Sequence, residues 1–237
     1  RAAGGAFLDM RARIERQIEQ RTMLLSGVSH DLRTPLTRMR LGLSFLDDDD
    51  REPLERDVDD MQRMLDEFLS FARGASDVTP EEVEFCPFFS DIAEGFNKQD
   101  DRVQIKTCDI DRPLMIKKMV MKRAIENLIN NALRYGQNVE LHAIQKKKSV
   151  IIRVEDDGPG IPEGKLQQIF EPFFTTRSQG TGLGLSVVKT VAQAHQGHVE
   201  VTNKSSGGAV FSLYLPIKLT TEQNDSRFQL NSQEEVA

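Results

Sequence analysis

The imidazole of His30 lies in the run SHDLRTPL at residues 29–36, among side chains that suit group transfer. A neutral imidazole is a nucleophile near physiological pH, because one ring nitrogen keeps an available lone pair. Asp31 is placed to hold the other ring nitrogen and to accept the proton released on attack. Thr34, one helical turn on, adds a hydroxyl to the same face. Together with Pro35 and with the segments of the second half of the chain, these residues favour chemistry at His30 over the ordinary alternative of a solvated surface histidine.

Three polar side chains share one stripe of a helix predicted over residues 118–135. Asn127, Asn131 and Arg134 fall at positions i, i+4 and i+7, apart from the apolar stripe of the same segment. Amide oxygens suit a hard cation, and a guanidinium suits a phosphate. Asparagine is also tolerated on a plain helix surface, so the stripe alone leaves both interpretations open.

Two glycine-rich segments follow this helix. A predicted strand over residues 150–154 runs through Glu155 and Asp156 into a Gly-Pro-Gly loop at residues 158–160. A carboxylate at a strand end can accept a hydrogen bond from an exocyclic amine, and glycines let the backbone approach a flat ring. The run GTGLGL at residues 180–185 then opens a helix, whose N-terminal N–H groups suit phosphate oxygens. It lacks the Lys-Ser/Thr of a P-loop and the βαβ context of a dinucleotide fold, which excludes both of those nucleotide-binding classes.

The order of these segments resembles that of a known family. The run at residues 29–36 resembles the H-box of the sensor histidine kinases of two-component systems, in which the residue matching His30 accepts a phosphoryl group. The later segments resemble the N, G1, F and G2 boxes of the Bergerat-type ATP-binding fold that histidine kinases share with gyrase, Hsp90 and MutL. The resemblance spans about residues 1–218 and is closest to the EnvZ class of osmosensor kinases.

The resemblance implies ATP and Mg²⁺ as ligands and gives each residue a role. Asn131 would coordinate Mg²⁺ with Asn127 in support, Arg134 would contact phosphate, and Tyr135 would lie against the nucleotide. Asp156 would bind the adenine amine. The remaining implied contacts are Gly158, Gly160 and Ile161 around the base, Phe170 to Phe174 as the F-box, Arg177 in a short lid at residues 175–179, and Gly180, Thr181, Gly182, Leu183 and Gly184 around the phosphates.

One position separates a kinase from an ATPase within this fold. The ATPase members carry a glutamate aligned with Asn127, and an amide cannot act as the base that activates water. Glu126 is adjacent, but one residue turns it by about 100° around the helix. Ala209 stands where many relatives have a threonine, so a hydroxyl contact is not expected there.

The resemblance therefore implies ATP-dependent phosphorylation of His30 and transfer of the phosphoryl group to an aspartate of a response-regulator receiver domain of the OmpR-like type. Thr34 would position water for dephosphorylation of that partner, which makes the protein bifunctional. Two alternatives remain at this stage: a Bergerat ATPase and a catalytically silent, nucleotide-binding dimeric scaffold.

Two amphipathic helices must position His30. Apolar residues spaced by three or four form a first seam of Leu25, Val28, Leu32, Leu36, Met39, Leu43 and Leu46. The run Asp47–Pro53 is expected to end the first helix, and Pro35 is expected to bend it. A second seam follows at Leu54, Val58, Met61, Leu65, Phe68 and Ala72. Residues 22–73 thus predict an antiparallel hairpin that pairs with a second copy as a four-helix bundle, with the response regulator docking around Arg38 to Leu46.

The rest of the chain divides around this hairpin. Residues 1–21 predict a helix, either a signalling helix that continues from an upstream, HAMP-like segment or an extra coil of the bundle. Residues 74–80 predict a linker. Residues 81–218 mix strands and helices, which predicts a two-layer α/β sandwich as the ATP-binding domain. Residues 219–237 are polar and aperiodic and predict a disordered tail.

Composition excludes several function classes. The 237 residues are 38% hydrophobic, enough for real cores, and the formal net charge of -6 argues against nucleic acid as a partner. The longest apolar runs are too short to span a membrane, so we expect the cytoplasmic portion of a bacterial inner-membrane sensor, soluble as a fragment and anchored through upstream segments. Cys86 and Cys108 are interpreted as free core thiols, with a disulfide as the minority alternative.

Overall fold

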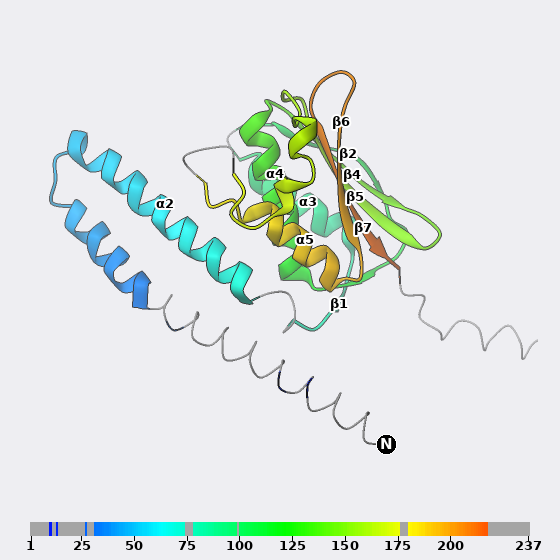
Figure 1. Ribbon diagram of the computed structural model, residues 1–237, viewed down its shortest axis with the longest axis horizontal. Coiled ribbons are helices and arrows are strands. Elements are labelled where there is room, and N and C mark those ends of the chain that lie inside the picture. Colours follow the sequence, from blue (N-terminus) through cyan, green and yellow to red (C-terminus); the bar gives the residue numbers. More distant parts are fainter. Residues whose placement is uncertain are drawn as a thin grey trace, which may run out of the picture.

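The chain folds as a helical hairpin followed by an α/β domain, as the sequence predicts (Figure 1). The computed structural model describes residues 10, 13, 27, 31–73, 78–98, 100–175 and 180–217. The predicted signalling helix, the linker and the tail therefore fall largely or wholly outside the described residues. Within the described residues, no helix is both long enough and apolar enough to cross a bilayer.

The hairpin consists of a helix over residues 31–43, a turn at residues 44–46 and α2 (Asp48–Arg73). Ion pairs join the two helices near both ends of the described part: Arg33 pairs with Asp66 at 2.6 Å, and Arg40 pairs with Asp59. Leu36 and Val58 are buried between the helices. These contacts confirm the antiparallel arrangement that the two seams predict.

The acidic run after the first helix begins α2 instead of separating the two helices. Asp48, Asp49 and Asp50 form the first turn of α2, where carboxylates interact favourably with the positive end of the helix dipole. Pro53 is typical of the first turn of a helix, but here it lies further inside α2. The first helix ends before this run, as expected, but the acidic residues themselves begin α2, because at a helix N-terminus the dipole offsets their mutual repulsion.

The α/β domain is built on a five-stranded sheet of order β2-β4-β5-β7-β6. β2 (Val103–Asp109) runs parallel to β4 (Val139–Gln145), and all other neighbours are antiparallel. β5 (Ser149–Asp156) lies at the centre beside β7 (Ala209–Pro216), and β6 (His198–Asn203) forms one edge. A separate two-stranded sheet pairs β1 (Glu81–Val83) with β3 (Leu114–Ile116).

Three helices cover one face of the large sheet (Figure 1). They are α3 (Phe85–Phe96), α4 (Lys118–Tyr135) and α5 (Gly184–Ala194). Burial alternates strictly along β5, because successive side chains of a strand point to opposite faces. The buried set continues into α4 through Met121, Ile125 and Leu128. The result is the two-layer sandwich that the sequence predicts, with one core between the helices and the sheet.

Three local expectations were wrong. The alternation of Val83 and Phe85 predicts a strand that includes both, but β1 ends at Val83 and Phe85 begins α3, where it packs against Phe88 and Phe89. The sequence also predicts a helix near residues 163–170, but this segment forms two 3-10 turns, η1 (Glu163–Lys165) and η2 (Gln168–Phe170), because Pro162 and the short loop leave too few residues for a stable α-helix. Cys86 and Cys108 form a disulfide that joins α3 to β2, because the packing of α3 on β2 brings the two thiols together across 22 residues.

Candidate functional site

The exposed stripe of α4 lines a polar cavity of about 350 Å³. Asn127, Asn131, Arg134 and Tyr135 all reach this cavity, because the opposite stripe of α4 is fixed in the core and the polar stripe must face away from it. The side-chain nitrogen of Asn127 donates to the carbonyl oxygen of Gly184 at 3.2 Å. This bond fixes the amide so that its oxygen is the atom left for a cation or a water in the cavity.

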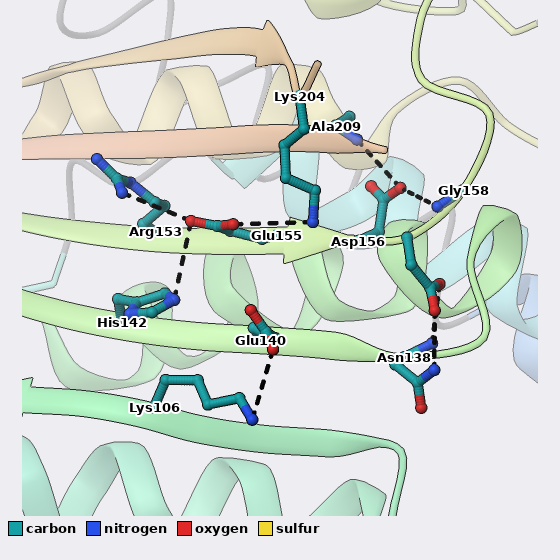
Figure 2. A network of polar contacts seen from close by, with 11 residues as sticks. Lys106, Asn138, Glu140, His142, Arg153, Glu155, Asp156, Gly158, Lys204 and Ala209 are labelled. Carbon is teal, nitrogen blue, oxygen red and sulfur yellow. Dashed lines mark hydrogen bonds and ion pairs between the residues drawn. The ribbon is translucent and has the colours of Figure 1, made fainter. Parts of the chain in front are cut away.

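A second, more apolar cavity of about 120 Å³ ends at the carboxylate of Asp156. Asp156 lies at the end of β5 and is only 4% exposed. One of its oxygens accepts from the backbone nitrogens of Gly158 at 2.9 Å and Ala209 at 3.2 Å (Figure 2). A buried carboxylate held by two backbone donors, with apolar walls around it, is suited to accept a hydrogen bond from an amine on a flat ring.

The two cavities join into one elongated site. Asn131, Tyr135 and Leu185 line both of them, so the cavities meet along the C-terminal end of α4 and the start of α5. One end of the site is apolar with a single buried carboxylate, and the other end is lined by amides, glycines and a guanidinium. This division matches a nucleotide, whose base is flat and whose phosphates are charged.

Glycines at the polar end are required by close approach of the backbone. Gly182 has φ of +66°, and a Cβ there would lie 2.5 Å from the carbonyl carbon of Phe173. The nitrogen of Phe173 donates to the oxygen of Gly182 at 3.1 Å, so the backbone of the two residues is in direct contact. Gly180, Thr181, Gly182 and Gly184 all line the polar cavity. The glycine run therefore brings backbone against the site, as the sequence predicts.

The loop beside Asp156 is held by its neighbour, Asp157. Asp157 accepts from the backbone nitrogen of Asn138 at 3.0 Å, from the Asn138 side chain at 2.8 Å and from the backbone nitrogen of Gln137 at 2.6 Å. The hydrogen bonds from Asn138, with that from Gln137, lower the pKa of Asp157 to about 2. Asp157 thus links the end of β5 to the turn after α4, where Tyr135 lies.

Glu155 points to the opposite face of the sheet from Asp156 (Figure 2). Around it lie Arg153 at 3.5 Å, His142 at 3.8 Å and Lys204 at 3.8 Å, and Lys106 pairs with Glu140 at 3.4 Å. Glu140, His142 and Glu155 have the residue types of a metal site and lie within 4.8 Å of one another. The lysine and arginine side chains already balance the charge of both glutamates, so this network serves to satisfy the outer face of the sheet.

The structure brings together most, but not all, of the predicted site residues. Gly160 and Ile161 line the apolar cavity, whereas Gly158 acts through its bond to Asp156. Phe170 and Leu183 line neither cavity: Phe170 packs edge-to-face on Phe211, which does line the apolar one, and Leu183 is buried in the protein.

The phosphoacceptor region is described only in part. Asp31 and Thr34 are exposed on the helix of residues 31–43. His30 and Arg177 lie outside the described residues.

Several lining residues were missed by the sequence analysis. The polar cavity also includes Asn130 and Leu185, and the apolar one includes Pro162, Lys165, Ile169 and Phe211. Thr175 and Phe174, which the sequence analysis placed in the lid and the F-box, line the polar and the apolar cavity respectively. Phe211 belongs to β7, distant in sequence, and only the strand order places it beside β5. Asn130 directly precedes Asn131, and the predicted stripe of positions 127, 131 and 134 was too narrow to include it.

The donor set of the polar cavity fits a hard cation. Asn127, Asn130 and Asn131 present amide groups within one polar cavity, and amide oxygens are ligands that Mg²⁺ accepts together with phosphate oxygens and water. Within the described residues, no cysteine lines the cavity. The charged side chains that line it are one carboxylate, Asp60, and two guanidinium groups, Arg63 and Arg134. The residues present therefore suit Mg²⁺ bound to a nucleotide more than a soft metal.

Comparison with known proteins agrees with this geometry. Residues 20–77 match the family model "His Kinase A (phospho-acceptor) domain", and residues 117–219 match "Histidine kinase-, DNA gyrase B-, and HSP90-like ATPase". The chain is 38% identical over 216 residues to the sensor histidine kinase GtrS of Pseudomonas aeruginosa, which covers 89% of this chain and 45% of GtrS. It is 31% identical over 235 residues to the sensor histidine kinase CpxA of Escherichia coli K12, covering 91% of this chain and 51% of CpxA. The chain thus spans about half the length of the curated relatives it matches.

The fold is also that of a solved structure. The crystal structure of full-length ShkA in complex with AMPPNP superposes with a TM-score of 0.72 at 22% identity, over 84% of this chain and 46% of ShkA. At that identity the likeness concerns the fold. With a phosphoacceptor domain followed by an ATPase-type domain, and with sensor histidine kinases among its relatives, the chain belongs to the sensor histidine kinases.

Proposed function

We propose that this chain binds Mg·ATP in the joined cavities and transfers the γ-phosphoryl group to His30, from which it passes to an aspartate of a response-regulator receiver domain. The observation that carries the proposal is the buried Asp156 carboxylate at the apolar end of a site whose other end is lined by Asn127, Asn131 and Arg134. A purine with an exocyclic amine and a phosphate chain satisfies both ends at once.

Asn127 favours phosphoryl transfer over hydrolysis. Its amide faces the polar cavity and has no basicity to activate water. The nearest carboxylate in sequence, Glu126, pairs with Lys122 at 3.8 Å and does not line the cavity. Neither residue supplies a base that would activate water. Among the described residues the one carboxylate that lines the polar cavity, Asp60, is held in an ion pair with Arg63, so the γ-phosphoryl group is expected to wait for a protein nucleophile.

Each group of the chain has a defined part in the transfer. Asp156 orients the base and the glycine run orients the phosphates, while Arg134 offsets negative charge. A ring nitrogen of His30 forms a bond to the γ-phosphorus as the bond from phosphorus to the β,γ-bridging oxygen breaks, and Asp31 takes up the proton that the imidazolium releases. ADP leaves. Bound Mg²⁺ would neutralise charge on the phosphate oxygens, with the amides of Asn131 and Asn127 among its ligands.

The hairpin is proposed to dimerise, because a single copy leaves its seams uncovered. Leu32, Met39, Leu46, Leu54, Met61 and Phe68 are seam residues that remain more than one third exposed in one chain. A second copy would cover them in a four-helix bundle. The likeness to CpxA supports an OmpR-like response regulator as the partner, and Thr34 is proposed to position water for its dephosphorylation.

Labelling with [γ-³²P]ATP and Mg²⁺ tests the proposal. We expect label that is labile in acid and stable in base, because a phosphoramidate of histidine has that stability. His30→Ala should abolish the label and leave nucleotide affinity unchanged, whereas Asp156→Asn should reduce both. Release of inorganic phosphate without labelled protein would favour the ATPase alternative, and nucleotide binding without either product would favour the silent scaffold.

A further inference from the structure

Helix α2 of the hairpin lies against the ATP-binding domain of the same chain (Figure 1). α2 contacts α5, and the guanidinium of Arg123 in α4 donates to the backbone oxygen of Asp66 in α2 at 3.0 Å. The Asp66 side chain in turn binds Arg33 of the first helix at 2.6 Å and Gln62 at 3.1 Å. Asp66 of α2 therefore contacts the first helix of the hairpin through its side chain and the ATP-binding domain through its backbone oxygen.

One face of α2 forms part of the wall of the polar cavity. Asp60, Arg63 and Met64 line it together with the residues from α4 and the glycine run. These three positions are spaced i, i+3 and i+4, so they lie on one side of α2. The hairpin thus borders the cavity end at which the phosphates of a nucleotide are proposed to lie.

The charged side chains that line the polar cavity carry a net positive charge, which favours an anion. Within the part of the chain that the structure describes, the cavity is lined by two guanidinium groups, Arg63 of α2 and Arg134 of α4, and by a single carboxylate, Asp60. Asp60 and Arg63 form an ion pair one turn apart. The Arg63 side chain is 66% exposed and that of Asp60 is 31% exposed, so the guanidinium is the more accessible partner of the pair.

We propose that Arg63 is a phosphate-binding residue supplied by the hairpin: phosphate oxygens of bound ATP compete with Asp60 for its guanidinium and thereby fasten α2 to the ATP-binding domain. A guanidinium forms paired hydrogen bonds to phosphate oxygens as it does to a carboxylate, and the triphosphate carries more charge than one carboxylate. Asp60 holds Arg63 at the cavity before the nucleotide enters and repels phosphate itself. The inference rests on the proposed function, since it needs ATP in this site.

Calorimetric titration of the full chain with ATP, ADP and adenosine tests this role. Arg63→Gln should weaken ATP binding roughly fivefold, because the lost contact is charge-assisted but partly solvent-exposed. Adenosine, which has no phosphate, should bind equally to the parent and the variant. Arg63→Lys keeps the positive charge but loses the paired hydrogen bonds, so it should restore only part of the loss in ATP affinity and leave adenosine binding unchanged. Arg56→Gln is the matched control: Arg56 lies on the same helix, is exposed, bonds only to the backbone of Glu52 among the described contacts, and does not line the cavity.

Asp60→Asn should change the affinity for ATP in the opposite direction to Arg63→Gln, which distinguishes the roles of the two residues. Removing its charge frees Arg63 and removes a repulsion, so ATP should bind more tightly than to the parent. If Asp60→Asn instead weakened Mg·ATP binding, Asp60 would be acting as a ligand for the cation, and the inference would be overturned. It would also be overturned if Arg63→Gln bound ATP as Arg56→Gln does, or if adenosine lost as much affinity as ATP. If the unchanged chain bound no ATP, the proposed function would fail instead.

Discussion

Asp156 shows how one side chain can set the ligand class of a site. It is buried, its carboxylate receives two backbone donors, and it closes an apolar cavity. A carboxylate accepts hydrogen bonds and cannot donate them when ionised. In the proposed function Asp156 would therefore favour a base with an amine at this edge over a base with a carbonyl oxygen there, which would separate adenine from guanine.

Asp156→Asn should lower the affinity for ATP by about tenfold or more, since a hydrogen bond to a charged group contributes about 1.5–3 kcal/mol. The amide oxygen can still accept from Gly158 and Ala209, so the fold should be retained. The preference for ATP over GTP should also narrow, because the new amide nitrogen can donate to a carbonyl oxygen. Competition between the two nucleotides for the parent and the variant measures this ratio. An unchanged preference for ATP would remove Asp156 from base recognition.

Thr34→Ala should slow the removal of phosphate from the partner's receiver domain and leave labelling of His30 largely intact. The hydroxyl of Thr34 is proposed to orient water, a role that the phosphorylation step does not use. Thr37→Ala is the matched control, because Thr37 lies one turn on and its hydroxyl donates to the backbone oxygen of Arg33. The decay of a phosphorylated receiver domain, measured with each variant, gives the comparison. Equal slowing by both variants would indicate a general effect on the helix.

At the scale of elements, α4 was predictable because its apolar and its polar residues both follow the helical period of 3.6 residues. The apolar stripe fixed its buried face, and the polar stripe at 127, 131 and 134 followed from the same periodicity. The central strands were predictable from alternation. Contacts that depend on strand order were not: Phe211 beside β5 and the disulfide between α3 and β2 require the assembled sheet. Arg63 at the cavity depends on how the hairpin meets the domain, which no local pattern in the sequence records.

His195 ties the end of α5 to the start of α4 and makes this joint sensitive to pH. Its Nδ1 donates to the oxygen of Val191 at 2.8 Å, while its Nε2 accepts from the backbone nitrogen of Lys117 at 3.0 Å. Burial, together with the charge of Lys117 and against the hydrogen bond to Val191, lowers the pKa of His195 below its ordinary 6.5. The neutral ring is the form that fits, since a protonated ring has no acceptor for Lys117.

The stability that His195 contributes should be complete above about pH 6.5 and should be lost as the pH falls below that value. The sign follows because the unfolded chain binds the proton more tightly than the folded one in this range. The free energy of unfolding in urea should be lower at about pH 5.5 than at about pH 7.5 for the parent, and the decrease should be smaller for His195→Gln. If the unfolding free energy of His195→Gln decreased as much as that of the parent, a group other than His195 would cause the pH dependence.

The whole molecule is expected to work as a dimer, because its hairpin seams are half exposed in one chain. Met39→Glu combined with Met61→Glu should shift the protein to monomers, since charges would have to be buried in the bundle. Light scattering coupled to size-exclusion chromatography measures the mass. Arg56→Gln, on the same helix, should stay dimeric. A double variant that remained dimeric would show that the seams do not form the interface.

The central claim concerns where the γ-phosphoryl group goes, and peptide mapping by mass spectrometry after incubation with Mg·ATP tests it most directly. The geometry of Asn127 and the carboxylate of Asp156 predict a phosphoryl group on the peptide that carries His30, in amounts that match the ADP formed. ADP formed in large excess over modified protein, with His30 unmodified and inorganic phosphate accumulating, would contradict the account.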